Sequence, residues 1–545
     1  MAAVILRAFG GIAPAIPPRF LSEQQAQTAK NVRVYPQVGP LAPMRGLSSS
    51  LMTLAKSGTI KSIYKFGDAE SATQYWFHWV SPDVDVVRGF VFGDVSKRTY
   101  FTGGESKPRV TDVTLALTGA GTAYPTNSYE LGVPKPTLPL TVSNLNGVVA
   151  EEELSETRVY TYTWVNSWGE ESEPFSADPM PFTHRVAVSE GQTVRVTMPT
   201  SPPGGPYNIT HKRIYRSVAA TAGAEYLYVG QVAAATATFD DAVDPLELGE
   251  SLPSMHWSMP PENLRGLVGL PNGVLAGFVE QDVYFSEPYR PFAWPLMYQQ
   301  AVGSLIVGLG VMDTTLVVLT NGKPYFIQGG HPDSMVMVEA DIPQACVSKR
   351  SIASMQGAVI YASPDGLVQI SPGGSSMITQ GLFTREQWQS FQPEKIHAYV
   401  HDGKYIAFHD TGGFIVDPAT GTFTLHELTA DGGYADLLTD TLYLTKGRAL
   451  HKWDAGTPMT YVWRSKQFTM PQPIGFTCIR VEAEAYPITG RLYRDGVLVH
   501  TYSFADNKTQ RVPSGRGRLW EVELESTAEV FRVGLATSPK ELMNG

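Results

Sequence analysis

Cysteine and charged residues are scarce in this chain, and both shortages exclude classes of function. Two of its 545 residues are cysteines, Cys346 and Cys478, which stand far apart and show no CxxC spacing. We predict two reduced thiols in the core, in keeping with assembly in a cytoplasm, rather than a disulfide or a metal pair. Only 17% of the residues are charged, the net charge is −10, and no run of five basic residues occurs. These features argue against binding of nucleic acid through phosphate neutralisation.

Long apolar runs and catalytic motifs are also missing. Residues 2–6 are too short for a signal sequence, and nowhere do about eighteen apolar residues follow one another. We therefore expect neither a cleaved signal nor a membrane span. The chain has no HExxH, no GxSxG, no Walker A loop and no GxGxxG after a predicted strand. We predict that it is not an enzyme and has no catalytic residues, no cofactor-binding residues and no cofactor.

Three histidines are the best candidates for a metal site. His397 and His401 would share one face of a strand, and His409 would lie on the partner strand across the Asp402-Gly403 turn. A zinc site also needs a water or carboxylate ligand and fixed supporting hydrogen bonds. Because histidine is common on solvated strand faces, we predict no metal site here.

Acidic runs and an aromatic band are the remaining candidates for chemistry. A glycosidase needs two carboxylates at a defined separation, and a sequence alone does not give that distance. We therefore interpret the acidic runs as solvated loops. The runs are Glu151 to Glu153, Glu170-Glu171 with Glu173, and Asp240-Asp241. The band Tyr75, Trp76, Phe77 and Trp79 could form a sugar platform. Alternation places Tyr75, Phe77 and Trp79 on one face, which favours a core between blades.

Turn-forming residues, by contrast, are plentiful. The chain has 51 Gly and 40 Pro, which favours an all-β protein. Between Arg265 and Trp453 an apolar strand, a tight turn and a second apolar strand recur about every forty residues, the period of a β-propeller blade. Asn321-Gly322 and Asp365-Gly366 are expected to supply the positive φ angles of primed hairpin turns. The five predicted hairpins span residues 274–285, 315–327, 358–370, 404–416 and 441–450.

The propeller is predicted to have about six blades from two parts of the chain. Residues 58–133 hold the first blade, with strands at 60–66, 74–80, 89–92 and 99–101, and its connection. Residues 254–463 hold the other five. The C-terminal segment 464–545 is predicted as a separate β domain that is able to share an edge with the propeller.

Proline punctuates residues 1–57, which limits the length of strands there. We predict an extended docking arm that folds against its own propeller or against a neighbouring subunit. Two short helices are expected in the whole chain. One covers residues 22–30, opened by a Ser22/Gln25 capping box, and the other covers residues 384–391.

An inserted β-sandwich is predicted over residues 134–253. Residues 157–165, 192–198 and 212–216 alternate apolar and polar side chains with period two, and two shorter strands follow at 226–230 and 236–240. The stretch 162–172, with its Glu-Ser-Glu-Pro exit at 171–174, resembles a strand and turn of fibronectin type III modules. That resemblance implies a module that mediates contacts.

Two terminal segments resemble the tail-nozzle proteins of short-tailed bacteriophages. Near the start, Asn-Val-x-Val from position 31 is followed by Gly-x-Leu-x-Pro-x-x-Gly from position 39. Near the end, residues 531–542 are similar to the closing strand of the same family. The resemblance implies a non-enzymatic subunit of the virion tail, made in the bacterial cytoplasm and assembled as a hexameric ring below the tail adaptor and the portal.

In such a ring, the resemblance implies a lumen that conducts DNA without specific binding, with tail fibres or tip proteins and the host envelope as further contacts. The alternative is a propeller-based tail protein that binds a receptor or a glycan. Depolymerase activity on that glycan is an open option within this alternative. Carboxylates and aromatics converging on one propeller face would favour it. DNA binding would require a patch assembled from scattered basic residues such as Lys212, Arg213, Arg216, Lys349 and Arg350.

Overall fold

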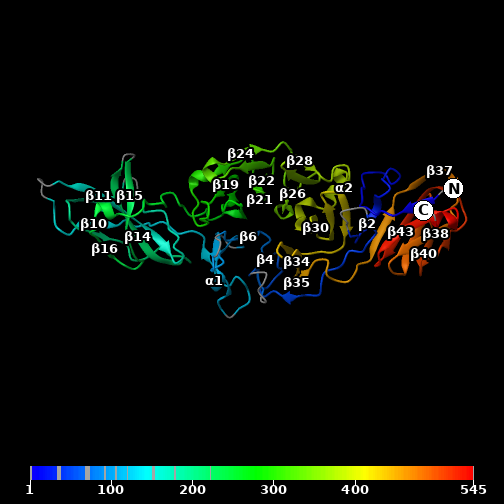
Figure 1. The fold of residues 1–545 in the computed structure, drawn as a ribbon, viewed down its shortest axis with the longest axis horizontal. Coiled ribbons are helices and arrows are strands. Elements are labelled where there is room, and N and C mark those ends of the chain that lie inside the picture. Colours follow the sequence, from blue (N-terminus) through cyan, green and yellow to red (C-terminus); the bar gives the residue numbers. More distant parts are fainter. Residues whose placement is uncertain are drawn as a thin grey trace.

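Strands dominate the structure, a computed structural model that describes residues 3–33, 39–67, 74–90, 94–104, 107–119, 121–149, 154–176, 180–220 and 223–543. Figure 1 shows an elongated molecule in which the strands of the insertion lie at one end. The propeller lies in the middle. The C-terminal strands and both chain termini lie at the other end, so the termini stand farthest from the insertion.

Five blades follow one another from Arg265 to Lys452, as predicted for the propeller; four are separate four-stranded sheets, and the fourth in order is the end of a ten-stranded sheet. All strand pairs inside these blades are antiparallel, and the first strands of successive blades pack side by side. The strands of the first three sheets are β17 Arg265–Gly269, β18 Leu275–Val279, β19 Asp282–Phe285 and β20 Gln300–Ala301; β21 Ile306–Met312, β22 Thr315–Thr320, β23 Tyr325–Gln328 and β24 Val336–Glu339; β25 Ala353–Met355, β26 Ala358–Ala362, β27 Leu367–Ser371 and β28 Gly374–Met377.

The fourth and fifth sheets complete this run, and the fifth needs a strand from the N-terminal arm. β3 pairs with β35 at its outer edge and so ties the start of the chain to the end of the propeller. The strands are β29 His397–His401, β30 Lys404–His409, β31 Gly412–Asp417 and β32 Thr422–His426; β33 Gly432–Asp436, β34 Thr441–Lys446, β35 Ala449–Lys452 and β3 Met52–Thr53.

The prediction of one blade in residues 58–133 is wrong, because these residues contribute to two sheets. The first is two-stranded, with β4 Ser62–Phe66 and β5 Tyr75–Trp79. The second has four strands, β6 Val84–Arg88, β7 Thr99–Gly103, β8 Arg109–Thr111 and β9 Tyr129–Glu130. The predicted strand at 89–92 extends past Phe90 into residues that lie outside the described part. A helix, α1 Val113–Leu117, connects β8 to β9.

These two sheets close the ring. The first strand β4 packs on β33, and β6 packs on β17. Phe66 and Phe77 of the two-stranded sheet share a core cluster with Phe101 of the neighbouring sheet. Within the described residues the ring therefore contains seven blades: five separate four-stranded sheets, the strands β29 to β32 of a ten-stranded sheet, and one two-stranded sheet.

All five predicted hairpins are confirmed as the second and third strands of their sheets, but the turn chemistry differs from the prediction. None of Asn321, Gly322, Asp365 and Gly366 has a positive φ. The residue before each turn holds it instead: the Thr320 hydroxyl donates to the Lys323 carbonyl at 2.7 Å and accepts from the Gly322 amide at 3.0 Å. The Ser363 hydroxyl repeats this arrangement, because it donates to the Gly366 carbonyl and accepts from the Asp365 amide. A hydroxyl that closes its own turn removes the need for a left-handed residue.

The predicted helix over residues 22–30 is wrong, because β2 (Ala26–Lys30) lies there. Ser22 and Gln25 do bond to each other, but they form a turn rather than a capping box: the Ser22 amide donates to Gln25 Oε1 at 3.0 Å. The strand lies between β32 and a C-terminal strand, and these long-range ladders override local helix preference. The other predicted helix is confirmed as α2 Arg385–Gln389, capped by Thr384.

The C-terminal strands form two facing sheets that are continuous with the propeller. One sheet runs from β29 through β32 and β2 into the C-terminal strands, and a single core cluster extends along it. The second contains β1 Ala3–Leu6 from the N-terminus. The elements are β36 Tyr461–Ser465, β37 Phe468–Ile474, β38 Cys478–Ala483, β39 Ile488–Arg494, β40 Val497–Phe504, β41 Gln510–Arg511, β42 Gly517–Ser526, β43 Val530–Ala536 and α3 Pro539–Met543.

The insertion forms a three-stranded and a four-stranded sheet around its own core. β10 Thr141–Asn144, β13 Val194–Thr197 and β16 Thr238–Asp241 form the first. β12 Arg185–Val188, β11 Glu156–Asn166, β14 Ile209–Ala220 and β15 Gly223–Ala233 form the second. Two sheets enclosing one apolar cluster make a β-sandwich, as the period-two pattern predicts.

Candidate functional site

The propeller axis is crossed by a lysine at the face where the inner strands begin. Lys349 precedes β25, and its ammonium bonds Asp83 and, at 2.6 Å, Asp85 of β6. Two sheets lie between these partners on one side of the ring and three on the other, so the contact spans the centre. Burial lowers the pKa of Lys349, but the two carboxylates outweigh it, and the pKa lies above its ordinary value.

The neighbouring residue Arg350 adds a second set of contacts across the axis. Its guanidinium donates to the Asp431 carbonyl at 2.6 Å and to the Lys61 carbonyl at 3.1 Å. Asp431 precedes β33 and Lys61 precedes β4, so one residue ties three sheets together. Lys349 and Arg350, together called the axial plug below, thus lie across this face of the propeller.

The opposite face of the axis is hollow. A cavity of about 590 Å³ lies at the ends of β4, β6 and β33, with Tyr64, Phe66 and Tyr434 in its lining. Lys65 and Asp436 form an ion pair of 2.5 Å in its wall, and each side chain is 5% exposed. Burial raises the pKa of Asp436, but hydrogen bonds from Lys65 and Thr439 outweigh it, and the pKa lies below its ordinary value.

The three candidate histidines do not converge. His397 is buried and its Nε2 lies 2.9 Å from the Ala430 carbonyl. His401 lies 3.6 Å from Asp440, and His409 contacts Thr411. Among the residues that the structure describes, no three His, Cys, Asp or Glu side chains are grouped to hold a metal ion.

The two cysteines are free and buried, as predicted. Burial raises the pKa of Cys346 to about 12, so its thiol is protonated at neutral pH. The aromatic band also lies where alternation places it. Phe77 and Trp79 pack between the sheets of β4 and β6, and Trp76 faces Tyr443 in the fifth sheet of the run.

The interpretation of the acidic runs as solvated loops is wrong for Glu170, Glu171 and Asp241, whereas Asp240 is exposed. Glu170 is 6% exposed, Glu171 2% and Asp241 0%. Glu171 accepts hydrogen bonds from Thr163 and Tyr215 and pairs with Arg213 at 2.6 Å. The cause is pairing with basic and hydroxyl side chains on neighbouring strands, which offsets the cost of burial. Glu151 to Glu153 lie outside the described residues.

The stretch that resembles fibronectin type III forms the joint between sandwich and propeller. Trp168 packs against the propeller cluster that contains Tyr100, and its ring lies 5.7 Å from that of Tyr129. Arg98 pairs with Glu170 at 2.9 Å and lies 6.0 Å from the Trp168 ring. The motif at 162–172 was the sequence signal for this joint. The blade that it contacts could not be predicted, because no nearby residue specifies it.

A second contact supports the same joint. Glu130 of β9 accepts from the Tyr207 hydroxyl at 2.7 Å and pairs with Lys107 at 3.1 Å. Ser258, on the return from the insertion, donates to Glu173 at 2.7 Å. The sandwich is therefore held on the propeller at several points around its base.

The opening segment that resembles tail nozzles contacts the chain directly before the closing one. The amide and carbonyl of Leu41 bond those of Val530, both at 2.9 Å. Asn31 adopts a left-handed φ of 57°, donates to the Thr460 carbonyl at 2.9 Å and accepts from the Glu427 amide at 3.2 Å. Residues 34–38 of the opening motif lie outside the described part.

The five scattered basic residues form no common patch. Lys212, Arg213 and Arg216 belong to β14 of the sandwich, whereas Lys349 and Arg350 lie at the propeller axis. Each has an internal partner: Lys212 donates to the Pro199 and Thr236 carbonyls, and Arg216 pairs with Asp241 at 2.8 Å. The described residues also include no helix both long and apolar enough to cross a membrane.

No family model and no curated protein matches this chain. Similar solved structures include the WD40 domain of Neurospora crassa Pan2, at 7% identity over 49% of this chain and 83% of that one, with a TM-score of 0.25. PorZ of Porphyromonas gingivalis is 10% identical over 89% and 82%, with a TM-score of 0.25. AztD from Citrobacter koseri is 12% identical over 68% and 99%, with a TM-score of 0.26. The all-β propeller fold rests on the sheets described above.

Proposed function

We propose that this chain is a structural subunit of the distal tail of a short-tailed bacteriophage, a nozzle protein assembled as a hexameric ring around the path of the DNA. The observation that carries the proposal is the junction of its two terminal segments. Leu41 in the opening segment bonds Val530, the residue directly before the closing segment, so the two segments that resemble the family start from one shared contact.

The side chains across the propeller axis support a lumen between subunits. Lys349 and Arg350 bond residues on the other side of the ring, so the proposed conduit runs between propellers and not through one. A propeller supplies a rigid body for such a ring, because each blade is fixed by its neighbours. Head-to-tail closure then gives every subunit the same pair of unlike contacts.

A second candidate, a glycan-binding tail protein, is favoured by the cavity on the open face of the axis. Its lining includes Tyr64, Tyr434 and Asp436, and the two tyrosine rings lie 5.5 Å apart. Among the described lining residues Asp436 is the only carboxylate, and Lys65 already pairs with it. Because glycoside cleavage uses two carboxylates, we propose binding without depolymerase activity for this candidate.

Electron microscopy of tails tests the nozzle proposal. A small tag inserted after Gly147, in the exposed turn between β10 and β11, should appear as six equivalent densities around the distal tail of purified virions. The same tag on a head protein provides the control. A protein that stays monomeric and is absent from purified virions would overturn the proposal.

A further inference from the structure

The C-terminal strands include a long edge that has no partner. β40 is the last strand of its sheet and, among the described residues, pairs only with β39. Its eight residues contain no proline, no acidic residue, no lysine and no arginine. Beyond that ladder, the described backbone hydrogen bonds of residues 497–504 comprise one, from Gln510 Nε2 to the Ser503 carbonyl at 3.4 Å. Val497 is 68% exposed and Leu498 48%.

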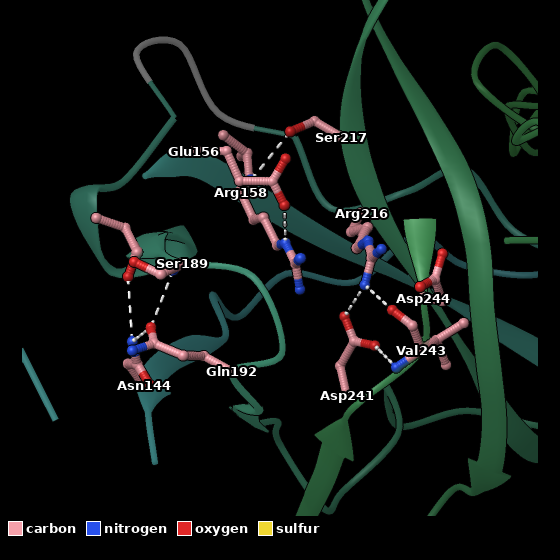
Figure 2. A network of polar contacts seen from close by, with 12 residues as sticks. Asn144, Glu156, Arg158, Ser189, Gln192, Arg216, Ser217, Asp241, Val243 and Asp244 are labelled. Carbon is pink, nitrogen blue, oxygen red and sulfur yellow. Dashed lines mark hydrogen bonds and ion pairs between the residues drawn. The ribbon is translucent and has the colours of Figure 1, made fainter. Parts of the chain in front are cut away.

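Free strand edges pair readily with other chains, so proteins block them with prolines, covering segments or inward-pointing charges. Several other edges of this molecule are blocked in these ways. Pro471 and Pro473 interrupt β37, and residues 249–252 cover part of β15 through backbone hydrogen bonds. β16 ends in a buried charge, Asp241, which Figure 2 shows bonded to Arg216. The edge of β40 has none of these protections, which suits it to pairing.

β1 offers a second free edge near the N-terminus. Its four residues are all apolar, it ends the facing sheet, and within the described part of the chain it pairs only with β43. A cavity of about 320 Å³ borders this strand, and Ile5, Leu6, Glu23 and Gln24 contribute to its lining. None of the described residues of β43 lines the cavity, so it lies along the free side of β1.

The two free edges lie on opposite sides of the C-terminal strands, at the end of the molecule that holds both termini (Figure 1). The sheet of β1 has the order β1, β43, β38 and β41, so β1 and β41 are at opposite ends of it. β40 lies beside β41: the Tyr502 hydroxyl donates to the Arg511 carbonyl at 3.2 Å, and Gln510 of β41 bonds Ser503. The edges of β40 and β1 are therefore separated by the width of the two sheets.

We propose that β40 of one copy of this chain pairs with β1 of the next copy, and that this contact repeats around the ring. Head-to-tail assembly needs two unlike surfaces on each subunit, and these two edges supply them. The added main-chain hydrogen bonds give affinity, and Val497, Leu498 and the cavity beside β1 give specificity. Pairing of two β40 strands with each other would stop at a dimer. The choice of head-to-tail pairing rests on the nozzle proposal.

Cysteine cross-linking of the concentrated, purified full chain tests this contact. The two native cysteines are buried, so introduced cysteines react alone. Ala3→Cys is combined in turn with Val497→Cys, Thr501→Cys and Ser503→Cys, because these exposed positions sample the length of β40. A short bismaleimide should link at least one double variant into a ladder of up to six chains, whereas every single variant should run as a monomer on a denaturing gel. Absence of a ladder from all three double variants would overturn the proposal, and so would dimers of a single β40 variant.

A charge placed on the edge should weaken the contact. Ser503 is exposed, and its ladder partner Thr489 is uncharged, so Ser503→Lys adds a protective charge to β40 without a clash inside its own sheet. Analytical ultracentrifugation should show at least a tenfold rise in the dissociation constant of the oligomer. Ser376→Lys, on the outer strand β28 of a propeller blade, is the matched control and should leave assembly unchanged. An oligomer unaltered by Ser503→Lys would refute the contact.

These results are distinguishable from those for the nozzle proposal. A cross-linked ladder from purified protein that is absent from virions would support the contact and contradict the nozzle. Six densities around the distal tail without any ladder would support the nozzle and refute the contact.

Discussion

The propeller is joined to its two neighbours in different ways. Toward the C-terminal strands the backbone ladder is unbroken, since β2 pairs with β32 on one side and with β36 on the other. Toward the sandwich the main contacts are side chains, with Trp168 packed on the blade of β9 and Glu170 paired with Arg98. The first joint makes two regions one cooperative unit, whereas the second attaches a module with its own core.

The largest effect is expected from removing the arm that makes the first joint. Deletion of residues 1–57 takes away β1, β2 and β3, and with them strands of the fifth blade and of both C-terminal sheets. We expect no soluble, cooperatively folded protein. Solubility and circular dichroism measure the outcome, and a folded truncated chain would show that the ladder is dispensable.

A point substitution sharpens the same test. Ala29 in β2 is 0% exposed in the cluster that extends from propeller to C-terminal strands. Ala29→Asp places an unpaired carboxylate there and should lower the free energy of unfolding by about 3 kcal/mol or more. Chemical denaturation gives the value, with Ala29→Ser as the milder control.

The second joint should tolerate loss of its whole module. Replacing residues 134–253 by a short Gly/Ser linker removes the sandwich core but leaves all seven propeller blades. We expect a soluble remainder with one cooperative transition. Differential scanning calorimetry checks this, and collapse of the remainder would mean that the sandwich and propeller form a single intertwined core.

These two joints also show what could be predicted from the sequence. The five hairpins were predictable, because both strands and the turn lie within about fifteen residues of one another, where periodicity and turn residues operate. β2 was not, because its partners around Leu425 and Val462 lie at the far end of the chain and override its local helical features. The axial plug joins Lys349 to Asp85 across 264 positions, and nothing in either segment specifies the other.

The pairing at the sandwich joint can be measured directly. Trp168→Ala should cost about 2 kcal/mol of stability in the propeller transition, less than for a fully buried tryptophan, since the ring is only partly buried. Arg98→Ala and Glu170→Gln, with their double variant, form a cycle that isolates the ion pair. We expect a coupling of about 1 kcal/mol. A coupling near zero would mean that packing of Trp168, and not the Arg98–Glu170 ion pair, stabilises the joint.

Acid should weaken the blade that continues into the C-terminal strands. Burial lowers the pKa of His397 and of His426 to about 3, far below their ordinary 6.5. The unfolded chain therefore takes up protons that the folded chain refuses, and stability falls as pH drops from about 6.5 toward 3. Each histidine contributes at most about 1.4 kcal/mol per pH unit.

Denaturation at pH 7 and pH 5 checks this prediction. The stability of His426→Gln should fall less between the two pH values than that of the original chain. His500 in β40 is exposed, so His500→Gln should leave the pH dependence unchanged. An unaltered pH dependence in His426→Gln would show that this histidine is protonated in the folded protein.

The smallest effect is expected on DNA binding, where the two regions should behave alike. Arg213 and Arg216 in the sandwich are paired with carboxylates, and Lys349 at the axis is held by Asp83 and Asp85. Each phosphate neutralised contributes about one unit to the salt slope of a binding constant, so cations already paired inside the chain have little to release. At near-physiological salt the Debye length is about 8 Å, and only close charge pairs count.

We expect no measurable binding of random-sequence duplex by fluorescence anisotropy. Sub-micromolar, steeply salt-dependent binding would instead mean that these ion pairs open on contact with DNA, and the proposed conduit would then retain DNA during ejection.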